Sequence, residues 1–184
     1  MQVADSVHDP GGKSRPPWPS DSKVTAVFSD CQCYRYQLRE VWDAGKPIVL
    51  WILMNPSVAC LDYSDPTLKR TGTFSRDWGY GGQLVGNVHA YRATDKKELL
   101  KVDDPVGPAN DEAILEMANQ AETVVLAYGL PPKRLRRRSK EVESLLADHP
   151  SVSYLRLTKD GMPEHPLYLP KNLIPLPYRK QAKL

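Results

Sequence analysis

The pattern of hydrophobic and polar positions changes character at Ile48. Before this residue, Lys23–Phe28 and Tyr34–Trp42 alternate polar and apolar side chains, which is typical of a β-hairpin with one solvated face. In the second strand this alternation puts Arg35 and Arg39 on the solvated face. After Ile48 the strand-like runs are mainly apolar, and continuous apolar runs are typical of strands covered on both faces.

Four such runs, separated by segments with helical character, predict a fold of the α/β class. They are Ile48–Met54, Gln83–Gly86 within a strand predicted over Gln83–His89, Thr123–Ala127 and Ser153–Leu157. A helix from Asp65 to about Trp78 is predicted, because Asp at the N-cap followed by Pro is a strong start signal. Two more helices are predicted at residues 108–120 and 133–147. This order indicates a three-layer α/β/α sandwich with a central, mainly parallel sheet of about four strands plus the N-terminal β-hairpin.

The two ends of the chain differ from its centre. Residues 1–22 are rich in Gly, Pro, Ser and Asp, so they are predicted to form a flexible arm, with docking through Trp18 as the alternative. The tail from Pro163 is proline-rich and is expected to be extended and irregular. Residues 23–184 are expected to form a single domain.

Composition narrows the class of protein. The 184-residue chain has a net charge of +3, and no apolar run approaches the roughly 20 residues that span a bilayer. The N-terminus lacks the features of a secretory signal, and three cysteines do not suggest a disulfide framework. Cys31, Cys33 and Cys60 do not have the spacing of a zinc site. A monomeric cytoplasmic protein without a metal or cofactor is therefore expected.

Polar and aromatic side chains follow the ends of the four apolar runs. Asn55, Asn87, Tyr128 and His165 each come at or shortly after the end of a run. In an open parallel sheet, ligands bind in the crevice beyond the carboxyl ends of the strands. The sequence therefore predicts that these four side chains meet at one pocket.

Several of these residues suit hydrolysis or recognition of a base. Asn55 could position a water molecule or bind a base edge, although it could equally be a turn-forming residue. Asn87 offers a donor and an acceptor side by side, as base recognition requires, or could be a core residue bonded to the backbone. His165, if it is not a surface loop residue, could donate a hydrogen bond to an anionic leaving group. Asp62 is a candidate general base.

One concentrated run of positive charge follows the third apolar run. It comprises Lys133, Arg134, Arg136, Arg137 and Arg138, together with Lys140. Positive charge is unfavourable at a helix N-terminus, so phosphate is the expected partner, with a solvated helix face as the alternative. Trp78 is a candidate for stacking on an unpaired base, although a tryptophan in a helix is more often part of the core.

The motifs occur in a recognisable order. An Asn-Pro-Ser turn at 55–57, the strand ending in Asn87, the strand ending in Tyr128-Gly129, and His-Pro-Leu-Tyr at 165–168 resemble the uracil-DNA glycosylase superfamily over about residues 48–170. More closely, the chain resembles a bacterial and phage family of small domains of unknown function, through Asn-Pro-Ser at 55–57, Asp-Pro-Thr at 65–67, Trp-Gly-Tyr-Gly at 78–81 and His-Pro-Leu-Tyr at 165–168.

That resemblance implies a role for each matching position. Asn55 would position the attacking water, Asn87 would read the flipped pyrimidine, and His165 would stabilise the departing base. Leu167 and Tyr168 fall where the superfamily inserts a wedge into the duplex. Ser57 stands where a uracil-specific enzyme carries a blocking group, which is compatible with a larger base.

The sequence therefore predicts a DNA glycosylase that flips out a modified or damaged pyrimidine and leaves an abasic site. An antiviral role against hypermodified phage cytosines, such as glucosylated hydroxymethylcytosine, fits the resemblance. Two alternatives remain open at this point: a non-catalytic nucleic-acid-binding domain, and an enzyme acting on free nucleosides or nucleotides.

Overall fold

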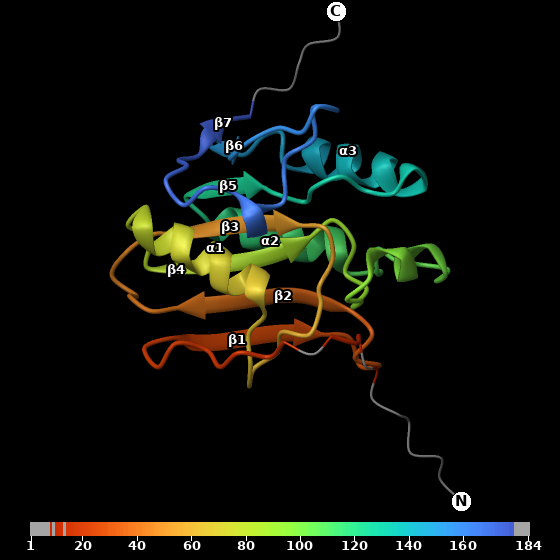
Figure 1. Cartoon of the computed structure of the whole chain (residues 1–184), viewed down its shortest axis with the longest axis horizontal. Helices are drawn as coiled ribbons and strands as arrows, with labels where there is room; N and C mark the ends of the chain where they lie inside the picture. Colours follow the sequence, from red (N-terminus) through yellow and green to blue (C-terminus); the bar gives the residue numbers. More distant parts are fainter. Residues whose placement is uncertain (1–7, 9, 13, 179–184) are drawn as a thin grey trace, which may run out of the picture.

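The computed structural model describes residues 8, 10–12 and 14–178, which form one seven-stranded mixed sheet with helices on both faces (Figure 1). The strands are β1 (Lys23–Phe28), β2 (Arg35–Val41), β3 (Ile48–Leu53), β4 (Gly82–Asn87), β5 (Thr123–Leu126), β6 (Val152–Tyr154) and β7 (Leu176–Pro177). The α-helices are α1 (Pro66–Asp77), α2 (Asn110–Gln120) and α3 (Arg136–Leu145). Short 3₁₀ helices are η1 (Lys96–Leu100), η2 (Lys133–Leu135) and η3 (Pro166–Tyr168).

The α/β class is confirmed, but the sheet is larger and more mixed than predicted. Its order is β1-β2-β4-β3-β5-β6-β7. Strand β3 is parallel to β4 and β5, and β5 is parallel to β6, whereas β1–β2, β2–β4 and β6–β7 pair antiparallel. The expectation of about four strands with an accessory hairpin was wrong, because β2 hydrogen-bonds to β4. This pairing satisfies the backbone groups that β4 would otherwise leave at an exposed edge.

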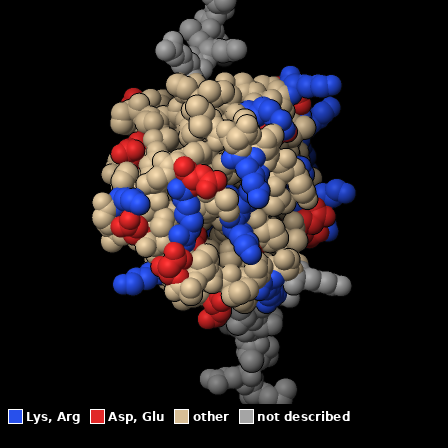
Figure 2. All heavy atoms as spheres, turned by 60° about the vertical axis from the view of Figure 1, so that its left-hand side comes forward, with Lys and Arg blue, Asp and Glu red and all other residues tan. Residues whose placement is uncertain are grey.

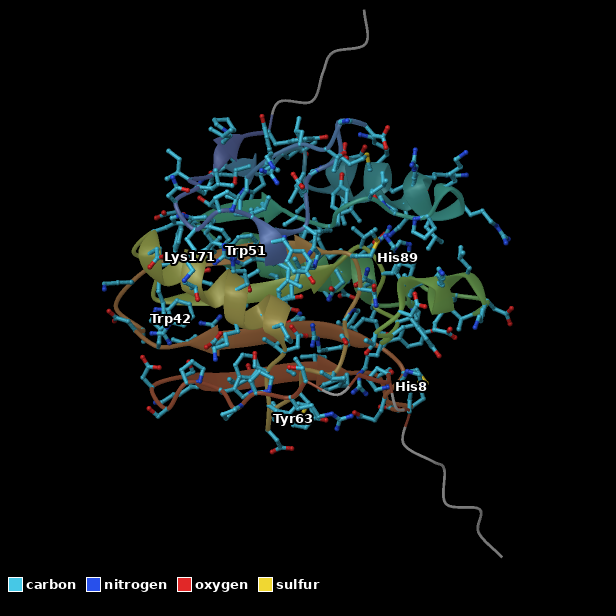
Figure 3. The ribbon with its side chains drawn as sticks, in the orientation of Figure 1. His8, Trp42, Trp51, Tyr63, His89 and Lys171 are labelled. Carbon is cyan, nitrogen blue, oxygen red and sulfur yellow. The ribbon has the colours of Figure 1, made fainter. Side chains whose placement is uncertain are left out.

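The two faces of the sheet bury separate hydrophobic clusters. On one face Leu68 and Phe74 of α1 pack against Trp51 of β3, which lies beneath the helix (Figure 3). On the other face Ile114 and Met117 of α2 join Val142 of α3 against β3, β4 and β5. Strand β3 is thus covered on both sides, as its continuous apolar run predicted.

Helix α1 begins where the sequence predicted. The side chain of Asp65 accepts a hydrogen bond from the backbone nitrogen of Leu68 (2.9 Å), and Pro66 occupies the first helical position. The helix ends before Gly79, whose positive φ of 89° reverses the chain. The start of α1 therefore lies at a defined position beside the end of β3.

A β-bulge changes which side chains of β2 face the helices. The register with β1 shifts between Val27 and Phe28, which pair with Gln37 and Arg35. Tyr36 is left between those two partners and packs with α2, and Arg35 turns inward and is only 1% exposed. The prediction that Arg35 lies on the solvated face was wrong, because an inserted residue reverses the alternation beyond it.

The terminal segments contact the sheet domain where the structure describes them. In the arm, Trp18 Nε1 donates to the carbonyl oxygen of Cys60 (2.9 Å), and the backbone nitrogen of Ser64 donates to the carbonyl of Pro16 (2.8 Å). The predicted flexibility of residues 1–22 stays a prediction, and residues 1–7, 9 and 13 lie outside the described residues. The tail is not wholly irregular, since it forms η3 and adds β7 to the sheet.

The described chain contains no helix that combines the length and the apolar character required to cross a bilayer. Its longest helix, α1, has 12 residues.

The turn between α1 and β4 provides a test of this architecture. A Cβ atom at Gly81 would lie 1.9 Å from the carbonyl oxygen of Asp43, whereas one at Gly79 would meet nothing within 4 Å. We expect Gly81→Ala to lower the free energy of unfolding by about 3 kcal/mol or more, because the backbone must move. Gly79→Ala should cost about 1 kcal/mol, from its positive φ alone. Urea denaturation measures both, and equal effects would contradict the packing of this turn.

Candidate functional site

A cavity of about 740 Å³ lies at the carboxyl ends of β3 and β5. Its wall combines Asn55 and Ser57 after β3, Tyr128 and Gly129 after β5, and His165 before η3. The first turn of α1 and the described arm residues Gly12 and Ser14 complete it. Since β3 and β5 are parallel neighbours, their carboxyl ends meet at one edge of the sheet, as the sequence predicted.

Asn55 is held with its carbonyl oxygen free. Its Nδ2 donates to the backbone oxygens of Ala93 (2.6 Å) and Pro56 (3.0 Å). Both partners are acceptors, so the amide nitrogen must face them and Oδ1 must face the other way. No described residue donates to Oδ1 in this structure. Asn55 is therefore suited to accept a hydrogen bond from a water molecule and is not suited to donate to a base edge.

His165 is held as a neutral donor. Its Nδ1 accepts a hydrogen bond from the backbone nitrogen of Leu167 (3.4 Å), at the start of η3. Burial lowers the pKa of His165, an effect that Lys96 reinforces and Asp65 opposes. A neutral ring with an accepting Nδ1 carries its proton on Nε2. The histidine can therefore donate one hydrogen bond from Nε2.

Gly129 allows the His165 loop to approach β5. Its φ is 70°, and a Cβ atom built there would lie 3.2 Å from the Cβ of His165. The backbone nitrogen of Gly129 also donates to the carbonyl of Pro163 (2.8 Å). A residue with a side chain would be strained here and would push His165 away from the strand.

Ser57 belongs to a short chain of hydrogen bonds that reaches the arm. Its hydroxyl lies 2.8 Å from Oγ1 of Thr94, and Thr94 donates to the carbonyl of Gly11 (2.7 Å). Thr94 has a single hydroxyl hydrogen, so Ser57 must be the donor of the first bond. Ser57 thus keeps only its lone pairs for a ligand.

Tyr128 forms a wall of the cavity and does not offer its hydroxyl. The hydroxyl donates to Glu143 of α3, and the ring is 1% exposed. Burial, followed by the contact with Glu143, raises the pKa of Tyr128 well above its ordinary range. The phenol is therefore not available for acid–base chemistry at neutral pH.

Three of the residues that the sequence suggested for catalysis or base recognition do not line the cavity. Trp78 is half-buried at the far end of α1, where it stacks on Trp51 of the core with ring centroids 5.4 Å apart. Asp62 is exposed in the loop before α1. Asn87 is buried one strand away, paired in register with Leu53, which does line the cavity. The side-chain amide of Asn87 has no hydrogen-bond partner among the described residues.

Leu167 and Tyr168 lie at the rim, where both line the cavity. Tyr168 is 91% exposed, which is unusual for an aromatic side chain. Helix η3 therefore presents an apolar and an aromatic group to solvent beside the opening.

The basic run divides into paired and unpaired residues. Arg136 lies 3.8 Å from Asp160, Arg137 bonds to Glu141, and Arg138 pairs with Asp111. The side chain of Arg138 is only 10% exposed and donates to the carbonyl of Val88, so it holds α3 to the end of β4. Lys133 and Arg134, in η2, are exposed and make no ion pair within the described part of the chain.

Lys133 and Arg134 follow Leu130, which lines the cavity, by only a few residues. Elsewhere on the surface, acidic and basic side chains are intermingled on the face that Figure 2 displays, toward the amino ends of the parallel strands. Within the basic run, the residues without an ion pair, Lys133 and Arg134 of η2, are therefore also the ones closest in sequence to the cavity wall.

Arg35 is a buried cavity residue that reasoning from sequence missed. It lines the cavity, and its Nη1 donates to the carbonyl oxygen of Ala59 (2.9 Å). Burial lowers the pKa of Arg35 to about 10, an effect that Asp65 opposes, and the guanidinium stays charged at neutral pH. Its inward orientation depends on the β-bulge in β2, for which the alternation of the sequence carries no signal.

Comparison with known proteins adds one finding. A family model described as "Protein of unknown function (DUF1643)" matches residues 35–167. The chain belongs to this family. The matched range includes the strands, helices and loops that bring Asn55, Tyr128 and His165 together in this DUF1643 protein. No curated protein and no solved structure matches the chain.

The pH dependence of stability tests whether the ring of His89, which follows β4, is buried in its neutral form. The ring is fully buried at the right-hand end of the sheet in Figure 3. Burial lowers its pKa from 6.5 to about 4, with Arg138 adding to this effect and Asp104 and the Met54 carbonyl opposing it. Between these two values the unfolded chain binds a proton that the folded chain does not. Stability should therefore fall as the pH decreases from 6.5 to 4.

We expect this one group to remove about 3 kcal/mol of stability between pH 7 and pH 4. The measurement is urea denaturation over a series of pH values, for the wild type and for His89→Gln. The variant should lose less stability than the wild type over the same range. Parallel curves would show that His89 is not held neutral by burial.

Proposed function

We propose that this DUF1643 protein is a DNA glycosylase that flips out a modified or damaged pyrimidine and hydrolyses its N-glycosidic bond. The observation that carries the proposal is a cavity lined both by Asn55, whose Oδ1 has no donor among the described residues, and by His165. These residues come from segments more than a hundred positions apart. The motif resemblance to the uracil-DNA glycosylase superfamily supports the same reading.

In the proposed reaction, Oδ1 of Asn55 accepts a hydrogen bond from the attacking water and orients it toward C1′ of the sugar. The glycosidic bond between C1′ and the base nitrogen breaks, and its electron pair leaves with the base. The water oxygen bonds to C1′, which has oxocarbenium character in the transition state, and its released proton neutralises the departed base. The products are an abasic site and the free base, so atoms and charge balance.

His165 would act on the departing base. A neutral imidazole with its proton on Nε2 can donate a hydrogen bond to the oxygen on which negative charge develops, without giving up the proton. A charge-neutral donor fits the lowered pKa of His165. Asp62 has no comparable support as a general base, because it is exposed and outside the cavity wall.

The size of the cavity favours a bulky base. Pockets of roughly 300–1,000 Å³ hold drug-sized ligands, and about 740 Å³ exceeds what an unmodified pyrimidine fills. At the position where the resemblance places the blocking group of a uracil-specific enzyme, the wall carries the small side chain of Ser57. A glucosylated hydroxymethylcytosine, as occurs in phage DNA, is the substrate class that this space suits, and excision of it would make the protein antiviral.

The rim supports access by DNA rather than by a free nucleoside. Tyr168 and Leu167 could fill the space that a flipped nucleotide leaves in the duplex, which offsets part of the unstacking cost of a few kcal/mol. Lys133 and Arg134 could contact the phosphates beside the opening. The buried, unpartnered amide of Asn87 would complete base recognition if the base reaches past Leu53.

Excision assays test the proposal directly. Duplexes carrying uracil, hydroxymethylcytosine or glucosylated hydroxymethylcytosine are incubated with the protein, and abasic sites are counted as alkali-labile breaks. We expect excision of a modified base. Asn55→Ala should slow it about 100-fold, through loss of water positioning. His165→Ala should slow it about 100- to 1,000-fold, through loss of a donor to the leaving group.

Asp62→Asn is the matched control and should leave the rate unchanged. Binding of DNA without breaks, with or without Asn55, would favour a non-catalytic nucleic-acid-binding domain instead. Activity on free nucleosides alone would favour a nucleoside-processing enzyme.

Removal of charge from η2 tests how DNA would bind. Lys133→Gln and Arg134→Gln should each weaken binding of duplexes of any sequence, and each should reduce the slope of log affinity against log salt by about 1. Arg138→Gln should instead lower the unfolding midpoint, since Arg138 is mostly buried and paired with Asp111. Fluorescence anisotropy at several salt concentrations measures the slopes. An unchanged slope for both η2 variants would exclude η2 as a phosphate contact.

A further inference from the structure

The cavity contains a buried positive charge that the reaction described above does not use. Arg35 is 1% exposed and lines the cavity together with Asn55 and His165. Its Nη1 bonds to the carbonyl of Ala59, while its buried Nε has no hydrogen-bond partner among the described residues. A buried N–H without a partner costs free energy, so a guanidinium that keeps such a group in a cavity wall favours binding of an acceptor there.

The other charged groups of the cavity wall already have partners. Asp65 accepts from the backbone of Leu68 as the N-cap of α1, and Asp95 accepts from the backbone of Lys97. The ammonium group of Lys96 donates to a backbone carbonyl. Arg35 makes no ion pair within the described chain. Among the cationic groups of the cavity wall, Arg35 is therefore the one that keeps a buried donor, Nε, without a hydrogen-bond partner among the described residues.

The backbone conformation of β2 places Arg35 in the cavity wall. The β-bulge in β2 turns Arg35 inward. Regular alternation would instead put it on the opposite face of the strand, with Gln37 and Arg39, which bond to α2. Bulges often redirect a single side chain toward a site. A buried guanidinium is unfavourable unless negative charge balances it. The carboxylate of Asp65, which lines the same cavity, supplies part of that balance, and an anionic ligand beside Arg35 would supply more.

We propose that Arg35 binds the negatively charged oxygen of the departing base. Its guanidinium would thus supply the positive charge that stabilises the leaving group in the cavity. This inference rests on the proposed glycosylase function and assigns a further contact to its leaving group. His165 donates a neutral hydrogen bond, and Arg35 adds the charge. The ligand chemistry at Arg35 is an anionic oxygen on a ring, and bases whose departing form lacks such an oxygen are disfavoured as substrates.

Binding of free ligands tests this without DNA. Barbiturate ion is the probe, because its negative charge is spread over the oxygens of a pyrimidine ring, and neutral uracil is the comparison. Titration calorimetry with the full chain should give at least about tenfold tighter binding of barbiturate than of uracil. Arg35→Gln should weaken barbiturate binding roughly 30-fold or more and leave uracil nearly unaffected. Arg35→Lys, which keeps the charge, should retain part of the preference.

Arg39→Gln is the matched control, because Arg39 lies on the same strand and bonds to Gln120 on the side of α2. It should bind both ligands as the wild type does. Equal binding of barbiturate and uracil by the wild type overturns the proposal, even if Arg35→Gln does not fold. Inorganic phosphate that binds more tightly than barbiturate, and depends on Arg35, also overturns it in favour of a phosphate site for free nucleotides.

The two proposals fail separately. Arg35-dependent binding of barbiturate without excision from any duplex would leave the anion site standing and remove the glycosylase function. Excision that proceeds at the wild-type rate in Arg35→Gln would leave the glycosylase function standing and remove the anion site.

Discussion

The parallel pairing of β3 with β4 and β5 is the constraint on which the rest of the structure depends. β3 is hydrogen-bonded along both edges and buried on both faces, so its register sets where the neighbouring strands end. Because β3 and β5 end side by side, the loop carrying Asn55 and the turn at Gly129 open onto the same space. The positive φ of Gly129 then lets the His165 loop close that space from the far side.

Around this edge, backbone groups orient the side chains of the candidate site. Two carbonyls hold the amide nitrogen of Asn55, and one backbone N–H holds Nδ1 of His165. Each contact uses one side of a two-sided polar group, and the other side has no hydrogen-bond partner among the described residues. Such preorganisation matters for catalysis, since a donor or acceptor that is already oriented costs no rearrangement when charge develops. The guanidinium of Arg35 is likewise positioned by one hydrogen bond, from its Nη1 to the backbone carbonyl of Ala59.

Local signals predicted most of the elements. The Asp65-Pro66 start of α1, the apolar runs of β3 and β5, and the end of α1 near Gly79 all follow from interactions within a few residues. The predicted strand after His149 was too long, since β6 comprises Val152–Tyr154 and the chain then leaves the sheet. The extent of the sheet was also misjudged, because pairing of β2 with β4 joins segments more than forty residues apart.

The sequence by itself determined the α/β class, the start of α1 and the meeting of Asn55, Tyr128 and His165 at one sheet edge, because parallel strands must end on the same side. Tertiary structure alone decided which polar groups remain free there. The bulge in β2 turns Arg35 inward. Arg138 forms an ion pair with Asp111, and Trp78 packs on Trp51 of the core. These outcomes depend on partners distant in the chain, and neither periodicity nor residue type carries that information.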